Sequence, residues 1–210
     1  MIEVIAEIAN AHQGNYKTAI KLAKQAFSSG ADAVKFQIYF ADELLVKSHA
    51  RYKHFLNQSF SLNQWKSIFL SQQNKKIYCD IFGIKALNVA IKYKVYGVKI
   101  HSSDLENLEL IKKIPKKMKV LLSCGGSNLF TISKAVKILN SNRIKPVLMH
   151  GFQAYPTNIQ DINFNRLKLL FNQFKNNVSL GFQDHTSGSD KINFYLPVLA
   201  MGIGAKYIEK

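Results

Sequence analysis

The sequence is poor in cysteine and has no long apolar run, and both scarcities narrow the possible functions. Its two cysteines, Cys79 and Cys124, lie far apart and lack the spacing of metal ligands, which favours a protein of a reducing compartment. No run approaches the about 18 apolar residues needed to span a membrane. The N-terminus enters a predicted strand at once, without a basic region or a cleavage site. We therefore predict a cytoplasmic protein that does not bind membranes.

Acidic residues are also scarce: 13 Asp and Glu face 29 Lys and Arg, for a formal net charge of +16. Nearly all of the excess is lysine, since Arg51, Arg143 and Arg166 are the only arginines. The lysines are dispersed along predicted helix faces, and asparagine and isoleucine are abundant, which is typical of an AT-rich coding bias. We therefore expect a general attraction for anionic small molecules rather than nucleic-acid binding.

Short apolar segments alternate with amphipathic ones along the whole chain, which predicts repeated strand–helix units. Between strands, Ser61 and Gln64 form a predicted capping box that begins one of the helices. The predicted strands are Ile2–Ala9, Ala33–Ile38, Lys76–Phe82, Gly97–His101, Lys119–Ser123, Pro146–His150, Val178–Phe182 and Ala205–Ile208. A polar and aromatic excursion from Tyr39 to Phe60 is expected to form an active-site loop.

Eight such units with little spare linker predict an α/β fold, a parallel (β/α)8 TIM barrel forming one domain over residues 1–210. A doubly wound open sheet is the alternative, but no Gly-x-Gly-x-x-Gly follows the first strand. Barrels of this kind usually have about 250 residues. Because this sequence stops after the eighth strand, we expect a barrel shortened at its C-terminus, without the final helix.

Polar residues follow nearly every predicted strand, at the end where parallel barrels carry their active sites. Each has a simple structural explanation: a histidine at a strand end can be hydrogen-bonded, and Ser102–Asp104 can cap a helix. Together they suggest chemistry, because lysines and hydroxyls suit a phosphate or carboxylate, imidazoles a divalent metal, and a glutamate acid/base work. The set includes Glu7, Lys35, Gln37, Asp80, Lys99, His101, Ser102, Ser123, His150, Asp184, His185, Glu209 and Lys210.

Several motifs in order along the chain resemble the N-acetylneuraminate (sialic acid) synthase family, which includes legionaminic and pseudaminic acid synthases. The most specific are Gly-Ala-Asp-Ala-Val-Lys-Phe-Gln, ending at Gln37, and Asp184-His-Thr186. The others are Ala6–Gly14, Val98–Asp104, Leu122–Gly125, His150 with Tyr155-Pro-Thr157, and Gly204–Lys210. The resemblance implies condensation of phosphoenolpyruvate with an N-acylated hexosamine, such as N-acetylmannosamine. The product is a nine-carbon 2-keto acid, and phosphate is released.

The resemblance also implies roles for individual residues. His150 and His185 are expected to hold Mn²⁺ or Mg²⁺, with both imidazoles directed at one ion. Lys35, Lys99, Ser102 and Ser123 are expected to converge on the phosphate and carboxylate of phosphoenolpyruvate. Glu7 is expected to be the acid/base or sugar-contacting group. The predicted catalytic residues are Glu7, Asp184 and Glu209. In addition to the lysines and serines above, Gln37, Asp80 and Tyr155 are predicted to contact the substrates.

The chain departs from the family pattern at several places. Gly151 stands where the family usually has cysteine, Asp80 lies in a segment where the family has hydroxyl residues, and Gln183 replaces a serine. We also expect these residues to lack the C-terminal antifreeze-like domain, which in the family reaches across a homodimer. Two alternatives follow: another metal-assisted aldol-type or phosphosugar enzyme, or a non-catalytic barrel. For the shortened barrel we expect Val4 or Ile5, and Tyr207 or Ile208, to contribute to an exposed apolar patch.

Overall fold

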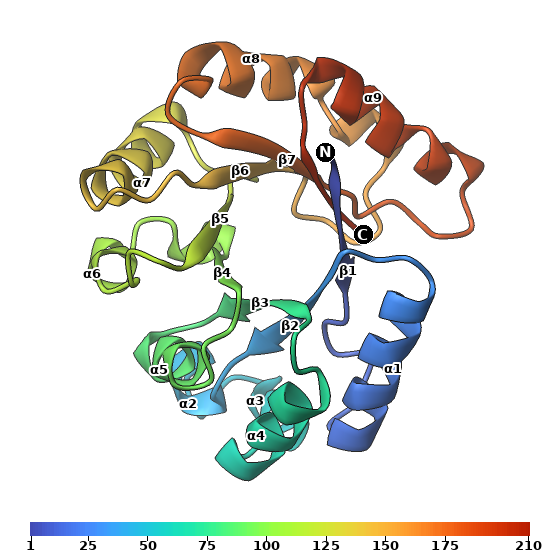
Figure 1. The fold of residues 1–210 in the computed structure, drawn as a ribbon, viewed down its shortest axis with the longest axis vertical. Helices are drawn as coiled ribbons and strands as arrows, with labels where there is room; N and C mark the ends of the chain where they lie inside the picture. Colours follow the sequence, from blue (N-terminus) through green and yellow to red (C-terminus); the bar gives the residue numbers. More distant parts are fainter.

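A computed structural model describes residues 1–210, and they form one closed parallel barrel in which each strand pairs with its neighbours in sequence and β8 closes on β1 (Figure 1). The predicted TIM barrel is therefore confirmed, and the open sheet is excluded. The strands are β1 (Glu3–Glu7), β2 (Ala33–Ile38), β3 (Lys76–Ile81), β4 (Gly97–Ile100), β5 (Lys119–Ser123), β6 (Val147–His150), β7 (Ser179–Gln183) and β8 (Tyr207–Glu209).

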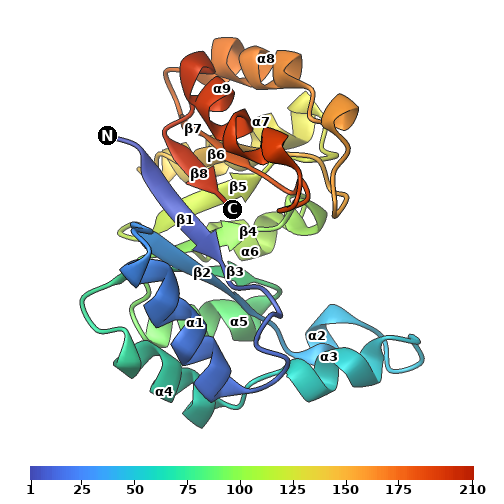
Figure 2. The same ribbon diagram turned by 90° about the vertical axis from the view of Figure 1, so that its right-hand side faces the viewer.

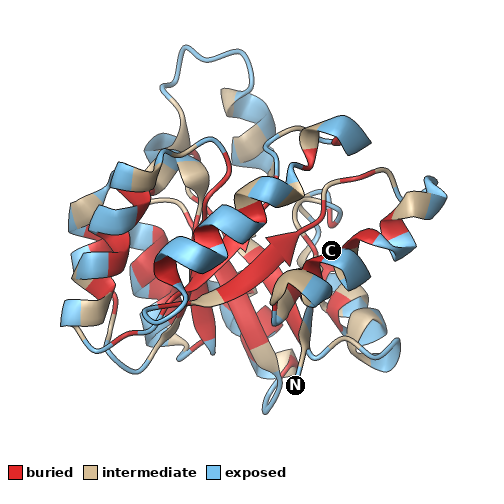
Figure 3. Cartoon of the chain, turned by 90° about the horizontal axis from the view of Figure 1, so that it is seen from above, coloured by how far each residue is buried: buried red, intermediate tan, exposed pale blue.

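Helices surround the barrel, and their inner faces pack on the outer faces of the strands (Figure 3). The predicted capping box of Ser61 and Gln64 is present and begins α4. The helices are α1 (Tyr16–Ser28), α2 (Ala41–Leu44), α3 (Tyr52–Gln58), α4 (Leu62–Ser71), α5 (Ile84–Lys92), α6 (Leu108–Lys112), α7 (Leu129–Ser141), α8 (Phe164–Phe174) and α9 (Leu196–Ile203), with short 3₁₀ turns η1 (Ser102–Asp104), η2 (Ile159–Asp161) and η3 (Lys191–Phe194). No helix is both long enough and apolar enough to cross a membrane.

The inside of the barrel changes from apolar to charged along the strands. A small apolar cluster fills its lower part, made of Ile5, Ala33, Tyr78, Leu121, Val147 and Met149. Because side chains alternate between the two faces of a strand, the next inward position lies two residues later. On β1 to β4 those positions are Glu7, Lys35, Asp80 and Lys99. The strand periodicity therefore builds a layer of charged groups above an apolar floor.

The excursion from Tyr39 to Phe60 folds into α2 and α3, which project from the barrel beyond the end of β2 (Figure 2). A cavity lies at the C-terminal mouth of the barrel, and none of the residues of this excursion lines it. The expected active-site loop therefore does not form the wall of that cavity. Tyr39 instead packs edge-on against Phe55, and its hydroxyl donates to Asn10 Oδ1 at 2.9 Å. Through this hydrogen bond the excursion contacts Asn10, which lines the cavity.

The expected apolar patch near β1 and β8 is present only in part. Val4 is 41% exposed, but Ile5 and Ile208 are buried, and Tyr207 is half-buried. Tyr207 packs against the apolar cluster inside the barrel. Ile5 is therefore covered inside the barrel, and Ile208 is covered in the core between the strands and the helices.

Candidate active site

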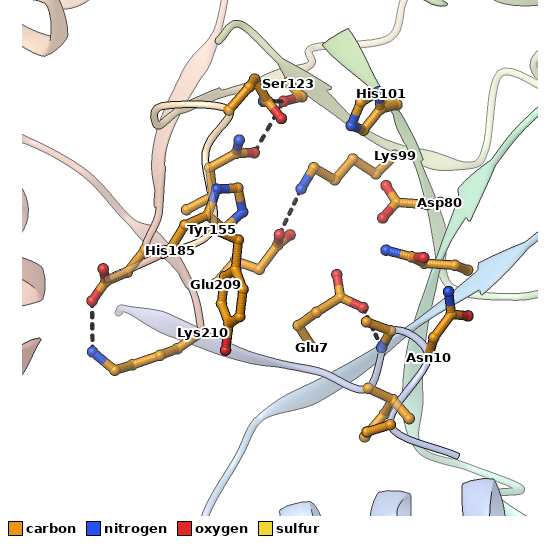
Figure 4. A pocket seen from close by; sticks show the side chains of 17 residues that line it. Glu7, Asn10, Asp80, Lys99, His101, Ser123, Tyr155, His185, Glu209 and Lys210 are labelled. Atoms are coloured by element: carbon orange, nitrogen blue, oxygen red, sulfur yellow. Dashed lines mark hydrogen bonds and ion pairs between the residues drawn. The ribbon is translucent and has the colours of Figure 1, made fainter. Parts of the chain in front are cut away.

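A cavity of about 510 Å³ opens at the C-terminal mouth of the barrel (Figure 4). Seven of the strands contribute to its wall, because their inward positions converge at this end. The lining residues are Glu7, Ile8, Ala9, Asn10, Ala11, Gln37, Asp80, Lys99, His101, Ser123, Gln153, Tyr155, Gln183, Asp184, His185, Glu209 and Lys210.

A buried network of ion pairs forms the base of the cavity. The ammonium group of Lys35, which is fully buried, contacts the carboxylates of Glu7 and Asp80 and lies 3.7 Å from Glu209 Oε1. The Lys99 ammonium donates to Glu209 Oε1 at 2.5 Å. Burial on its own would lower the pKa of Lys35, but the three carboxylates hold it well above its usual range. Lys35 is therefore charged, and both lysines already have carboxylate partners.

Glu7 is the carboxyl group of this network that titrates near neutral pH. Burial raises its pKa to about 7; Lys35 opposes the shift, and the nearby carboxylates of Asp80 and Glu209 add to it. Burial would also raise the pKa of Glu209, but Lys35 and Lys99 outweigh it and keep that pKa below its usual range. Two neighbouring carboxyl groups thus differ in protonation, which is the usual arrangement for general acid/base chemistry.

The polar groups of Asp184 are already engaged. Its Oδ1 accepts from the backbone N–H and the hydroxyl of Thr186, and its Oδ2 accepts from Lys210 Nζ at 2.6 Å. Burial would raise the pKa of Asp184, but these donors keep it below its usual range. The carboxylate therefore fixes the turn that carries His185, which is a positioning role.

Nine of the predicted site residues line this one cavity: Glu7, Gln37, Asp80, Lys99, Ser123, Tyr155, Asp184, His185 and Glu209. Lys35 lies in the charged network without lining the cavity. Ser102 is not in the wall, because it follows the inward-facing His101 and begins η1. The expected convergence of Lys35, Lys99, Ser102 and Ser123 on one anion is therefore incomplete.

The structure does not bring the two histidines of the predicted metal centre into one cavity. On β6, Val147 and Met149 point into the barrel, so His150 points outward. Its Nε2 donates to the Ile162 carbonyl at 2.7 Å, and it lines a separate cavity of about 730 Å³ that does not include His185. No group of three or more His, Cys, Asp or Glu side chains is arranged to hold a metal ion.

His185, in contrast, faces the mouth of the barrel. Its Nδ1 donates to the Phe152 carbonyl at 2.7 Å, and the ring of Tyr155 lies edge-on with its centroid 6.5 Å away. A donating Nδ1 leaves the lone pair of Nε2 free, which is the tautomer that binds metals or accepts protons. The two histidines, which have similar sequence surroundings, therefore have different environments.

Five polar lining residues had no assigned role in the sequence: Asn10, His101, Gln153, Gln183 and Lys210. His101 and Lys210 were visible as strand-end residues. Asn10 and Gln153 lie in loops, where no periodicity indicates their orientation. The sequence predicts that β7 ends at Phe182, so Gln183 is not among the predicted strand-end residues and is only a departure from the family pattern. In the structure β7 ends one residue later, at Gln183.

The fold and the cavity define this chain as a parallel β/α barrel with a charged site at the C-terminal ends of its strands. The sequence model of the NeuB family matches residues 22–210, and the chain belongs to that family.

Several known proteins are similar in sequence to nearly the whole chain. An uncharacterized protein of Methanocaldococcus jannaschii is 33% identical over 99% of this chain and 60% of its own length. The N,N'-diacetyllegionaminic acid synthases of Legionella pneumophila and Campylobacter jejuni are 28% and 30% identical over 99% of this chain, and over 62% and 66% of their own lengths. The chain thus spans about three fifths of the length of the first two of these relatives.

A solved structure with the same barrel is the sialic acid synthetase of Leptospira borgpetersenii, crystallised with citrate. It superposes with a TM-score of 0.90 at 26% identity, covering all of this chain and 72% of that chain.

Proposed function

We propose that this barrel condenses phosphoenolpyruvate with an N-acylated hexosamine to give a nine-carbon 2-keto acid and phosphate. Family membership and relatives named as legionaminic acid synthases support this class of reaction. The observation that carries the proposal is the pairing, in one cavity, of the Lys99 cation with the carboxyl group of Glu7, whose pKa is about 7. A polyanionic donor needs cations, and the new C–C bond and the added water need proton transfer.

The proposed reaction balances as follows. The methylene carbon of phosphoenolpyruvate attacks the aldehyde carbon of the open-chain sugar, water adds to the former enol carbon, and phosphate leaves. The aldehyde oxygen gains one proton of the water. The other water proton leaves with the phosphate when the C–O bond breaks, so that the former enol carbon becomes the keto carbon. A carboxyl group with a pKa near 7 serves either transfer with similar driving force, and we assign this role to Glu7. Lys99 is assigned to the anionic groups of the donor.

A second candidate function is favoured by Asp80. Its carboxylate contacts Lys35, and Lys99 is paired with Glu209, so both cations expected to bind the donor already have carboxylate partners. Another aldol-type or phosphosugar reaction with a less anionic donor would suit such a site better. A non-catalytic barrel is the third possibility.

We expect the purified protein to release inorganic phosphate from phosphoenolpyruvate only when an N-acylated hexosamine is present. The measurement is a phosphate assay across N-acetylmannosamine and its dideoxy, diacetamido relatives, with unacylated mannosamine as the control. Turnover of other aldehydes without phosphate release would favour the second function. Binding without any turnover would favour the non-catalytic barrel.

Divalent metal binding stays a prediction, and the structure changes which histidine it concerns. We expect His185→Ala to weaken Mn²⁺ binding at least tenfold, because Nε2 of His185 is free at the barrel mouth. His150→Ala is the matched control, and its Mn²⁺ affinity should equal that of the wild type. Isothermal titration of Mn²⁺ into the three proteins tests this. Equal affinity in all three, or loss only in His150→Ala, would contradict it.

A further inference from the structure

The positive charge of the loops is concentrated at the N-terminal end of the barrel, opposite the mouth. The seven connections that lead from a helix to the next strand contain nine Lys and Arg residues and one acidic residue, Asp32. The nine are Lys75, Lys94, Lys113, Lys116, Lys117, Arg143, Lys145, Lys175 and Lys206. The seven connections from a strand to the next helix, with α2 and α3 counted in the one that follows β2, contain four Lys and Arg residues and seven acidic residues. A coding bias toward lysine explains the number of cations but not this separation.

The cations of the N-terminal face are too far from the mouth to attract its substrates. On β5, Lys119 begins the strand, and Ser123, which lines the cavity of the mouth, ends it. The two residues are roughly 13 Å apart along the strand, whereas salt at physiological concentration screens charges over about 8 Å. The charge of this face therefore acts on a different ligand.

Five of the cations at this end line one hollow with a volume of about 270 Å³. They belong to two neighbouring connections, 113–118 and 142–146, and to the first residue of β5. The residues of this N-terminal hollow are Tyr96, Lys116, Lys117, Met118, Lys119, Arg143, Ile144 and Lys145. No carboxylate lies among them, so the hollow is purely cationic.

None of these five cations is neutralised by the chain itself. The ion pairs use other lysines, namely Lys35, Lys76, Lys85, Lys99, Lys112 and Lys210. Helix C-termini attract cations, but only within the last turn. The last turn of α7 has no basic residue, and Lys116, Lys117 and Lys145 lie beyond the C-caps of α6 and α7, which are Lys113 and Asn142. The repulsion among these like charges is relieved when an anion binds.

The arrangement suits a ligand with adjoining negative charges. One phosphate group carries about −1.5 to −2 charges, which is fewer than five cations can neutralise. Lys119 and Lys145 stand at the same level of the sheet, because each lies two residues before a member of the Leu121–Val147 pair. Two linked phosphates can therefore contact both connections at once. The volume lies below the about 300 Å³ at which pockets for drug-sized ligands begin, so it favours a small group.

We propose that the N-terminal hollow binds a diphosphate group. This site is separate from the mouth of the barrel and goes beyond the proposed function. The diphosphate belongs either to inorganic pyrophosphate or to a nucleoside diphosphate, which share this chemistry.

Titration calorimetry with pyrophosphate compares the wild type with Lys116→Ala/Lys117→Ala, in which both replaced side chains are exposed. We expect the affinity to fall at least tenfold, the effect of losing two charged contacts. The matched control is Lys47→Ala/Lys53→Ala, which changes the net charge equally at exposed positions of the excursion after β2. Its affinity should stay within twofold of the wild type. Lys116→Arg/Lys117→Arg keeps both charges and should keep the affinity.

Two further probes define the ligand. Orthophosphate should bind the wild type more weakly than pyrophosphate, because one phosphate cannot contact both connections. ADP separates the two sources: tighter binding than pyrophosphate makes a nucleotide the ligand, and equal or weaker binding makes it inorganic pyrophosphate.

Three results would overturn the site. Equal losses in the two alanine variants would show a general effect of net charge. Equal affinities for orthophosphate and pyrophosphate would show that the two connections do not act together. A protein that binds single-stranded DNA through Lys116 and Lys117 but no pyrophosphate would have an extended polyanion surface in place of a diphosphate site.

Discussion

Replacing Lys35 with methionine is expected to destabilise the protein by about 3–5 kcal/mol at pH 8, the usual effect of removing one partner from a buried ion pair. The ammonium group is the shared counterion of Glu7 and Asp80 and lies near Glu209, in a layer where only the Glu7 side chain, at 22% exposure, is not buried. Without it, these carboxylates are desolvated with only Lys99 as a cation nearby. Urea denaturation followed by circular dichroism measures the change in the free energy of unfolding.

The matched control is Lys85→Met, which removes an ion pair to Asp42 of similar length in which both side chains are 53% exposed. Ion pairs between exposed side chains contribute little to stability because water screens them, so this variant should lie close to the wild type. Lys35→Met/Asp80→Asn should recover part of the loss, because it removes a carboxylate that has lost its counterion. Equal stability of Lys35→Met and Lys85→Met would show that the network does not stabilise the barrel.

Replacing Glu7 with glutamine is expected to lower kcat about 10²- to 10⁴-fold, the range for loss of a general acid/base. The wild-type pH profile of kcat/KM should contain a limb near pH 7, where Glu7 titrates, and the variant should lack that limb. Steady-state phosphate release between pH 5 and 9 measures both. A variant that keeps the limb would assign it to another group.

The stability of the Glu7→Gln variant provides an independent check. Because the folded state raises the pKa of Glu7 from 4.5 to about 7, it binds this proton more tightly than the unfolded state. The resulting stabilisation is fully present below about pH 4.5 and is lost as the pH rises through 7. The free energy of unfolding of the wild type relative to Glu7→Gln should therefore fall between pH 5 and 8. A difference that does not change with pH would mean that the pKa of Glu7 is unshifted.

Much of the fold could be predicted from the sequence because parallel strands buried on both faces are short continuous apolar runs with clear ends. β2 and β5 begin and end where they were predicted, and the other strands differ by one to two residues at an end. The end of each strand, in turn, indicated which residues could reach the barrel mouth. Eight of the nine site residues that line the cavity were found in this way, since the C-terminal ends of all strands in a parallel barrel meet at one face. The ninth, Tyr155, came from the family resemblance.

The direction of each side chain was not determined by the sequence. A strand with apolar residues on both faces does not show which of two alternate positions faces the barrel interior. His150 and His185 therefore looked equivalent, although one points outward to the Ile162 carbonyl and the other into the mouth. The one-residue shift at the end of β7 likewise concealed that Gln183 faces the interior beside Glu209.

The sequence by itself determined the eight strand–helix units, the closed barrel and the charged residues at the strand ends, because these follow from local periodicity and from element order. Tertiary structure decided which charges neutralise one another. Lys35, Asp80 and Glu209 come from segments far apart in the chain. Pairing of β2 with β3 puts Asp80 in contact with Lys35, and closure of the barrel between β8 and β1 brings Glu209 close to them. The raised pKa of Glu7 arises from that pairing and closure, since it depends on burial among groups that no local sequence pattern connects.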